Sequence, residues 1–428
     1  MRNILLIGNS CKEDSISWKL NEENNVGNIF ITPGNAGCYF KSKTRNIILN
    51  PDNKKEISEF LIKEKINYIN LTSLNFFSNE IEDIASELKI PLIGPSKRIK
   101  SFFNSRINIK NFLKKYSINT LYYQVIDNFT ELKNIVENFS SKKFISSDIQ
   151  NGFKGFYLIE SKGQGIKILE FIQTNRAAKD SKFIVENYQK GEEFSAIIVL
   201  DGLNYILFPV LRIYPKSFDN DYGLYTSGMG AFTPCPSFNN NDITLLNEKI
   251  IFPLIEGLKE EKLLYKGFMT IHFIKSMDRL FVLNILPTLN SPEIETLIPL
   301  FNSSFNDLCL SIISQNLINY TLKLNPLSSL SVVLASKGYP IDSEKGVLIA
   351  GLDKNYEGIN VFFNKTSIIN YSKNRGFISS GGRVLTLNSI KPKLEDAYKA
   401  VYEILENNKI FFDGNFYRSD IGEKYFKK

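Results

Sequence analysis

A short apolar run that ends at a glycine opens the chain and constrains its fold more than any other feature. Residues 3–8 form this run, residues 15–20 follow with the spacing of a helix, and residues 29–32 are apolar again. A buried strand, a helix and a second buried strand at this spacing form a βαβ unit. The alternation of helical and strand patterns continues at residues 57–64, 68–71, 81–88 and 91–94. We therefore expect residues 1–103 to form a small parallel α/β domain.

The middle of the chain has a different pattern, because short strands there alternate with single helices. A glycine-bearing turn at residues 152–155 separates two short apolar segments within residues 144–159. Closely spaced strands with turn residues between them favour antiparallel pairing. The sequence thus predicts an α/β and α+β multidomain fold. Further strands are predicted at residues 183–187, 195–200, 205–210, 266–274 and 280–286, and helices at residues 107–116, 165–175 and 308–318.

Composition argues against several classes of protein. The 428 residues are 43% hydrophobic, enough for more than one buried core. A net charge of +7 is small for this length; it argues against nucleic acid binding and suits small anionic ligands. The four cysteines are scattered and form no zinc motif. Because no apolar run approaches about 18 residues and the opening run is too short for a signal peptide, we expect a cytoplasmic protein without a membrane partner.

Three blocks stand in a fixed order in the last hundred residues. They resemble the carboxy-terminal domain of the phosphoribosylamine-glycine ligase family, and upstream segments extend the resemblance over essentially the whole chain. The blocks are SVVLASKGYP at 331–340, GGRVL at 381–385 and FYRSDIG at 416–422, with Lys345-Gly346 and Gly351-Leu352-Asp353 between the first two.

The resemblance implies an architecture and a reaction. Residues 1–103 would bind substrate, residues 104–327 would form an ATP-grasp domain with a small lobe at about 121–190, and residues 328–428 would form a β-rich carboxy-terminal domain. The implied reaction is the ATP-dependent ligation of glycine to 5-phosphoribosylamine in de novo purine biosynthesis, carried out by a monomer. Its product would be glycinamide ribonucleotide, with ADP and phosphate released.

An ATP site between the two lobes follows from the resemblance. The family's glycine hairpin covers the phosphates, and here it carries Lys154 and Gly155; glycine lets the backbone approach the phosphates and lysine supplies positive charge. A surface hairpin with an ordinary lysine is the competing interpretation, and adjacent carboxylates on a turn are usually only solvated. The other residues implied to hold the nucleotide are Arg106 at the phosphates, Glu186 near the adenine, and Glu192 and Glu193 at the ribose.

Two glycine-bearing segments are implied to hold the reacting groups. Residues 226–231 read TSGMGA, and we expect Thr226, Gly228 and Gly230 at the reacting centre, because main-chain amides at a glycine turn can bind an anion. A plain tight loop is the alternative. The second segment, residues 33–37, is expected to contact the phosphoribosyl group. The substrate-binding candidates are therefore Gly8, Pro33, Gly34 and Asn35.

The chain departs from the family where the catalytic metals bind. When the sequences are aligned on Pro292-Glu293, the family's metal-binding glutamate becomes Asn284 and its asparagine becomes Leu286. Magnesium requires hard oxygen ligands in near-octahedral geometry, so these changes predict a weakened Mg²⁺ or Mn²⁺ site. Asn284 then marks only the position of a ligand, and Glu293 is the carboxylate that remains. Ser146 similarly replaces a phosphate-binding lysine of the family.

Two further expectations concern the function. His272 is the only histidine and lies in an apolar segment, so we expect it in the core rather than in catalysis. Because metal ligands are lost, two alternatives to the ligase stay open: a catalytically inactive homologue that serves as a nucleotide- or partner-binding scaffold, and an ATP-grasp ligase with a changed acceptor. For the ligase, the partners are the small molecules glycine and 5-phosphoribosylamine.

Overall fold

Five parallel strands form the sheet at the amino terminus, as the opening pattern predicts. The computed structural model describes residues 1–73, 80–151, 154–174, 182–371 and 374–427. The sheet order is β3-β2-β1-β4-β5, with every pair parallel. The strands are β1 (Arg2–Gly8), β2 (Val26–Pro33), β3 (Thr44–Asn46), β4 (Ile66–Leu71) and β5 (Leu92–Ile93), and the helices between them are α1 (Cys11–Asn21), α2 (Lys54–Lys63) and α3 (Glu80–Glu87).

Alternation along β1 shows why this sheet is covered on both faces. Side chains of consecutive strand residues point to opposite faces. Ile4 and Leu6 join a core that includes α1, whereas Leu5 and Ile7 join a second core with α2 and α3. A strand that is buried on both sides must be apolar throughout, and this explains the unbroken apolar run at the start of the chain.

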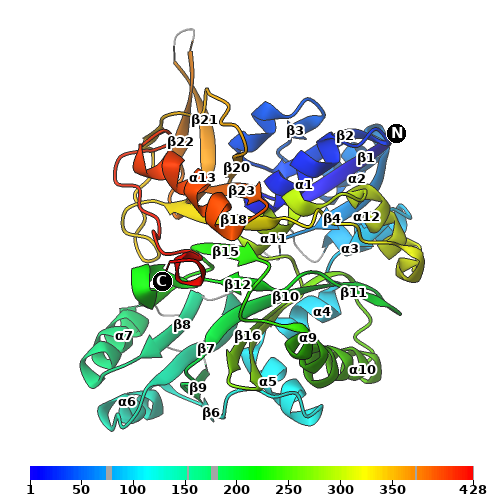
Figure 1. Cartoon of the computed structure of the whole chain (residues 1–428). Helices are drawn as coiled ribbons and strands as arrows, with labels where there is room; N and C mark the ends of the chain where they lie inside the picture. Colours follow the sequence, from blue (N-terminus) through cyan, green and yellow to red (C-terminus); the bar gives the residue numbers. More distant parts are fainter. Residues whose placement is uncertain (74–79, 152–153, 175–181, 372–373, 428) are drawn as a thin grey trace.

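A four-stranded antiparallel sheet forms the small lobe, drawn in teal at the lower left of Figure 1. Its order is β6-β9-β7-β8, and helices α6 and α7 pack on it around Leu132, Val136, Ile168 and Ile172. The elements are β6 (Tyr123–Ile126), β7 (Lys143–Asn151), β8 (Lys154–Ile159), β9 (Phe183–Asn187), α6 (Phe129–Glu137) and α7 (Lys162–Thr174).

The largest sheet joins the middle of the chain to its end. Its path is β17-β16-β10-β12-β15-β18-β23-β20, and β11 pairs with β10. Because β15 pairs with β18, three strands of the last hundred residues, β18, β23 and β20, extend this sheet, whereas three others between residues 348 and 379 form a smaller sheet of their own. Its strands are β10 (Glu192–Asp201), β11 (Tyr205–Leu207), β12 (Leu211–Ile213), β15 (Gly230–Thr233), β16 (Lys266–Ser276), β17 (Arg279–Leu286), β18 (Ser328–Ala335), β20 (Asn360–Phe363) and β23 (Arg383–Lys391).

Smaller elements complete the described structure. A strand pair, β13-β14, and a three-stranded sheet, β19-β22-β21, accompany the large sheet, and helices surround it (Figure 1). The remaining strands are β13 (Lys216–Phe218), β14 (Tyr222–Tyr225), β19 (Leu348–Ile349), β21 (Thr366–Tyr371) and β22 (Asn374–Ser379), and the remaining α-helices are α4 (Lys97–Phe103), α5 (Arg106–Lys115), α9 (Asn240–Leu246), α10 (Phe252–Glu260), α11 (Glu293–Leu297), α12 (Phe305–Ile313) and α13 (Leu394–Glu406).

The predicted fold class is confirmed: a parallel sheet at the amino terminus, antiparallel sheets elsewhere and a β-rich carboxy-terminal part. That part also contains α13, which the sequence analysis did not predict. Ala397, Val401 and Leu405 recur every four residues along this helix and are buried against β18 and β23. The domain boundaries at 103 and 327 stay predictions.

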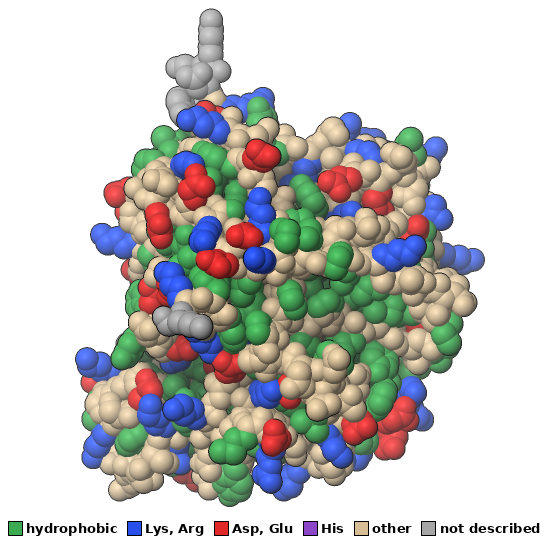
Figure 2. Space-filling model, viewed as in Figure 1, with side chains coloured by type: hydrophobic (Ala, Val, Ile, Leu, Met, Phe, Trp, Pro, Cys, Tyr) green, Lys and Arg blue, Asp and Glu red, His purple; other side chains and the backbone are tan. Residues whose placement is uncertain are grey.

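Two surface properties bear on partners. On the face shown in Figure 2, acidic and basic side chains are interspersed, in line with the small net charge. Within the described residues, every helix is too short or too polar to cross a bilayer.

Candidate active site

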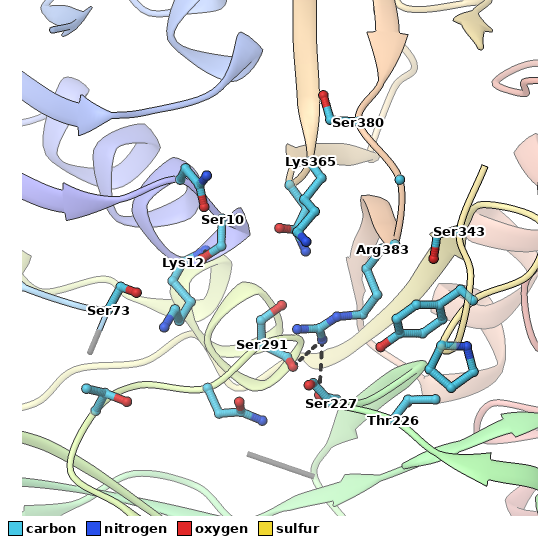
Figure 3. A pocket seen from close by; sticks show the side chains of 18 of the residues that line it. Ser10, Lys12, Ser73, Thr226, Ser227, Ser291, Ser343, Lys365, Ser380 and Arg383 are labelled. Atoms are coloured by element: carbon cyan, nitrogen blue, oxygen red, sulfur yellow. Dashed lines mark hydrogen bonds between the residues drawn. The ribbon is translucent and has the colours of Figure 1, made fainter. Parts of the chain in front are cut away.

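A cavity of about 790 Å³ lies where three regions of the chain meet. Its walls come from residues 9, 10, 12, 73, 100 and 104, from residues 225–227, 286 and 288–291, and from residues 339–343, 345, 364–365 and 380–383. Figure 3 shows Lys12, Lys365 and Arg383 reaching toward it from separate elements. Lys100 and Lys345 add two more cations, against the single carboxylate of Asp342. This excess of positive charge, with many hydroxyl and amide groups, suits a small phosphate-bearing ligand.

Arg383 forms hydrogen bonds to two turns that line this cavity, one at residues 226–228 and one at residues 288–291. Its Nη1 donates to the carbonyl oxygens of Ser227 at 3.0 Å, Gly228 at 3.3 Å and Ser291 at 2.5 Å (Figure 3). One guanidinium therefore fixes the 226–228 turn relative to the segment that ends β17. The sequence analysis missed Arg383 as a site residue, although it stands in the GGRVL block used to identify the family.

The turn at Thr226 has the conformation that its glycine pattern predicts. Thr226 Oγ1 donates to the carbonyl of Pro215 at 2.8 Å and accepts from the amide of Gly228 at 3.0 Å. Gly228 has φ +111°, and a Cβ there would lie 2.5 Å from Cδ of Pro292, so only glycine fits. Thr226 lines the cavity. Gly230 instead lies within β15, where a Cβ would contact Ile421.

The predicted phosphoribosyl loop lies beside the cavity and braces it. The wall begins at Asn9 and Ser10, one residue after Gly8. The amide of Gly34, which follows Pro33, donates to the carbonyl of Gly8 at 3.1 Å. Asn35 Nδ2 donates to the carbonyls of Phe363 at 2.6 Å and Ser10 at 3.2 Å. The side chain of Asn35 thus joins the amino-terminal sheet to β20.

Lys12 lines the cavity from the amino-terminal part of the chain, and the sequence analysis did not select it. Its Nζ donates to the carbonyl of Thr72 at 2.7 Å. Burial lowers the pKa of Lys12, and the Coulombic influence of Glu13 opposes that shift. It lies in the first turn of α1, and no motif distinguishes it from other lysines in the sequence.

Two of the predicted nucleotide residues lie together in a buried ionic cluster. Glu186 accepts a hydrogen bond from Lys110 Nζ, and both side chains are buried. Arg106 lies with its guanidinium carbon 5.3 Å from the centre of the Phe156 ring. Burial lowers the pKa of Arg106 to about 10, against the opposing charges of Glu186 and Asp148. Lys110 was not predicted, because nothing in the local sequence marks it as the partner of Glu186.

The two carboxylates predicted to hold the ribose also have partners within the chain. Glu193 accepts a hydrogen bond of 2.6 Å from the hydroxyl of Tyr225, and burial raises the pKa of this carboxyl group. Glu192 accepts from Ser237 at 2.5 Å and from Lys424. Burial tends to raise the pKa of Glu192, but the bonds from Lys424 and Ser237 outweigh it and lower the pKa.

An aromatic cluster fills the space between the small lobe and the large sheet. The rings of Phe144 and Phe156 are stacked with centroids 4.8 Å apart. Tyr225 meets them edge-on, at 5.6 Å and 5.2 Å. The cluster links the lobes between the Glu186 and Glu193 positions. The side chain of Lys154 lies outside the described part of the structure, whereas Gly155 is described and has φ +77°.

The residues at the predicted metal position do not fit a divalent cation. Asn284 is buried and Leu286 offers no oxygen, while the carboxylate of Glu293 accepts from His272 Nε2 at 2.8 Å and from Asn290 Nδ2 at 2.8 Å and 2.9 Å. Among the residues that the structure describes, no three His, Cys, Asp or Glu side chains gather as a metal cluster. His272 is fully buried, as expected for a core histidine.

Comparisons with known proteins cover the whole chain. Three profiles of phosphoribosylglycinamide synthetase match: the N domain at residues 2–101, the ATP-grasp (A) domain at 104–286 and the C domain at 329–424. A phosphoribosylamine-glycine ligase of Fusobacterium nucleatum is 28% identical over 427 residues, covering 99% of this chain and 98% of that one.

Two solved structures show the same fold. The phosphoribosylamine-glycine ligase of Thermotoga maritima superposes with a TM-score of 0.77 at 24% identity and covers 98% of this chain and 100% of its own. The biotin carboxylase domain of a Hydrogenobacter thermophilus 2-oxoglutarate carboxylase, solved with ADP and its magnesium salt, has a TM-score of 0.68 at 12% identity, covering 97% of this chain and 91% of its own.

Proposed function

The chain belongs to the phosphoribosylglycinamide synthetase family, and from this premise we propose that it ligates glycine to 5-phosphoribosylamine, with ATP converted to ADP and phosphate. The observation that carries this function is the composition of the cavity. Residues from all three matched regions line it, and they surround it with five cations. An enzyme that joins two small substrates, one of them a phosphate ester, needs such a meeting point.

The family's chemistry assigns each bond change. A carboxylate oxygen of glycine attacks the terminal phosphorus of ATP and ADP leaves, which forms an acyl phosphate. The amine of phosphoribosylamine then attacks the acyl carbon, phosphate leaves and the amine loses a proton. The amide product is glycinamide ribonucleotide. Because both steps move negative charge between oxygens, fixed cations and main-chain donors around the reacting atoms are the contribution expected of the protein.

The cavity residues have roles that follow from their positions. Lys12 and Arg383 supply positive charge on opposite sides of the space, where the phosphate of phosphoribosylamine would bind. The turn at Thr226 and Gly228, which Arg383 holds in place, would lie against the reacting carboxyl group. Gly8, Pro33, Gly34 and Asn35 would position the amino-terminal wall.

ATP would bind between the lobes, near Arg106, Lys154, Gly155, Glu186, Glu192 and Glu193. Glu186, Glu192 and Glu193 are bonded to other side chains of the chain, so a nucleotide exchanges these bonds for its own. A divalent cation coordinated by residues 284–293 forms no part of this proposal, because the donor set there does not fit one. The comparisons give no support to a non-catalytic scaffold or to a changed acceptor.

The test is a complete three-substrate assay read by mass spectrometry. The purified chain should form glycinamide ribonucleotide only when ATP, glycine and phosphoribosylamine are all present, with one ADP for each product molecule. The ligase from Fusobacterium nucleatum serves as the positive control for substrate quality. ATP consumption with no glycinamide ribonucleotide, under conditions where the control forms it, would refute the assignment.

A further inference from the structure

The neighbouring strands β16 and β17 bring an imidazole to the position where the family's metal would bind. His272 and Asn284 are directly opposite each other in the antiparallel pair, and Leu286 is two residues further along β17. After β17 the chain turns back, so that Glu293 reaches His272. His272, Asn284 and Glu293 are each at most 1% exposed. The carboxylate that could attract a cation is therefore enclosed together with a nitrogen donor.

Hydrogen bonds identify the charge state of this group. Asn290 Nδ2 donates to Oε1 of Glu293 at 2.8 Å and to Oε2 at 2.9 Å. Because Asn290 donates to both carboxyl oxygens, we assign Glu293 as a carboxylate and His272 Nε2 as the donor of their 2.8 Å bond. A buried carboxylate is costly unless it is paired and hydrogen-bonded. The pair satisfies that requirement without a metal ion.

We propose that the His272–Glu293 pair replaces the divalent cation at this position. The turn at residues 288–293 then adopts the conformation that lines the cavity without a bound metal ion. Thr288, Asn290 and Ser291 of this turn line the cavity, and Ser291 accepts from Arg383. The pair thus supports the cavity from behind, and His272 is a positioning residue that does not touch the substrates. This inference goes beyond the ligase function and does not depend on it.

The direct test is a titration of the full chain with Mn²⁺, read by electron paramagnetic resonance, beside melting curves in EDTA and in Mn²⁺. The wild-type chain should bind no Mn²⁺ at this position and should melt at the same temperature in both buffers. One bound Mn²⁺ per wild-type chain that disappears in Glu293→Gln would overturn the proposal. Neither readout uses ligase activity, so a failure of the proposed function leaves this test intact.

A matched pair of variants separates replacement of a cation from ordinary packing. His272→Ala removes the imidazole bonded to Glu293 and leaves Asn290 as its remaining side-chain donor. Thr270→Ala, two residues away on the same strand, removes a 2.8 Å bond from its hydroxyl to the carbonyl of Thr288 in the same turn. In EDTA, His272→Ala should have a lower melting temperature than Thr270→Ala. Mn²⁺ should raise the melting temperature of His272→Ala, because a ligand that binds the native state stabilises it, and should leave that of Thr270→Ala unchanged.

Two outcomes of the variant experiment would contradict the proposal: equal melting temperatures of the two variants in EDTA, or equal recovery of both by Mn²⁺. His272→Gln, which keeps an N–H donor, provides a milder variant. It should lie between wild type and His272→Ala in EDTA. The wild-type titration needs no variant, so the proposal can be refuted even if His272→Ala does not fold.

Discussion

The hydroxyl of Tyr225 donates a 2.6 Å hydrogen bond to Oε1 of Glu193 and so connects the 790 Å³ cavity to the contact between the lobes. Tyr225 lines the cavity, and its ring packs edge-on against Phe144 and Phe156 of the small lobe. One side chain therefore contacts the cavity, the lobe interface and a carboxylate predicted to hold the ribose. Substitutions at Tyr225 should therefore affect the proposed binding of both phosphoribosylamine and ATP.

Tyr225→Phe keeps the ring and removes only the hydroxyl. It leaves the half-buried Glu193 carboxyl with one donor fewer, and an unsatisfied polar group that is shielded from water costs at most about 1–3 kcal/mol. We expect the free energy of unfolding, measured by urea denaturation, to fall by that amount. Tyr222→Phe is the matched control, because Tyr222 is 70% exposed and should change nothing. Equal stability of Tyr225→Phe and wild type would show that the bond does not compensate the burial of Glu193.

Lys110→Met should destabilise the chain strongly. It leaves the buried Glu186 without its lysine, and removal of one partner of a buried ion pair costs about 3–5 kcal/mol. The double variant Lys110→Met with Glu186→Met should recover most of this loss, because it removes both charges. Urea denaturation of the two single variants and the double variant forms a complete mutant cycle.

The exposed pair Lys399–Glu395 on α13 gives the control for this cycle. Both side chains are exposed to solvent, so Lys399→Met should lower the free energy of unfolding far less than Lys110→Met does. Strictly additive losses at Lys110 and Glu186 would mean that the two residues act independently, contrary to the ionic cluster described above.

Arg383→Lys should weaken the proposed reaction without removing a charge. Lysine cannot reproduce the contacts of the planar guanidinium with the carbonyls of Ser227, Gly228 and Ser291, so the two turns lose their common anchor. Loss of about 2–3 kcal/mol of such bonding corresponds to a fall of about 100-fold in kcat/KM for phosphoribosylamine. Lys354→Ala, at an exposed position, is the control. An unchanged kcat/KM in Arg383→Lys would show that the contacts of Arg383 do not contribute to the reaction.

Glu295 should make stability depend on pH. It is fully buried, and burial raises its pKa to about 8, with the charge of Arg383 opposing the shift. The folded chain keeps this proton up to about pH 8, whereas the unfolded chain loses it near the ordinary value of 4.5. The native state therefore binds more protons between these values, and stability should fall as pH rises from about 4.5 to 8.

Glu295→Gln removes this dependence. The variant should gain stability relative to wild type at pH 8 and gain little at pH 5, as measured by urea denaturation at both values. Each unit of pKa shift corresponds to about 1.4 kcal/mol. A gain of the same size at both pH values would show that the change acts through packing and not through the proton.

Local patterns were sufficient to predict the amino-terminal sheet. The apolar run at β1 and the spacing to β2 and β4 predict a parallel sheet, because strands buried on both faces are apolar throughout. The pairing of β15 with β18 has no such local signal, since the two strands are separated by most of a hundred residues. Sequence blocks identified the family in that region, but they did not predict that its strands continue the large sheet.

The sequence predicted those parts of the candidate site where the backbone conformation allows only one residue type. Gly228 needs a left-handed conformation beside Pro292, and a glycine-rich pattern reveals such a turn. Lys12, Lys110 and Arg383 depend on partners far away in the sequence, so their roles emerge only from the folded chain. The substitutions at 284 and 286 were visible in the sequence, whereas the bond between His272 and Glu293 was not.

An isotope experiment tests the central claim, ligation through an acyl phosphate, most directly. The chain is incubated with ATP, phosphoribosylamine and glycine that carries ¹⁸O in both carboxylate positions, and the released phosphate is analysed by mass spectrometry. The account predicts one ¹⁸O in each phosphate and one in the amide of glycinamide ribonucleotide, because the carboxylate oxygen that attacks phosphorus leaves with it. Phosphate without ¹⁸O, released while ATP is consumed, would show that water and not glycine receives the phosphoryl group, and would contradict the account.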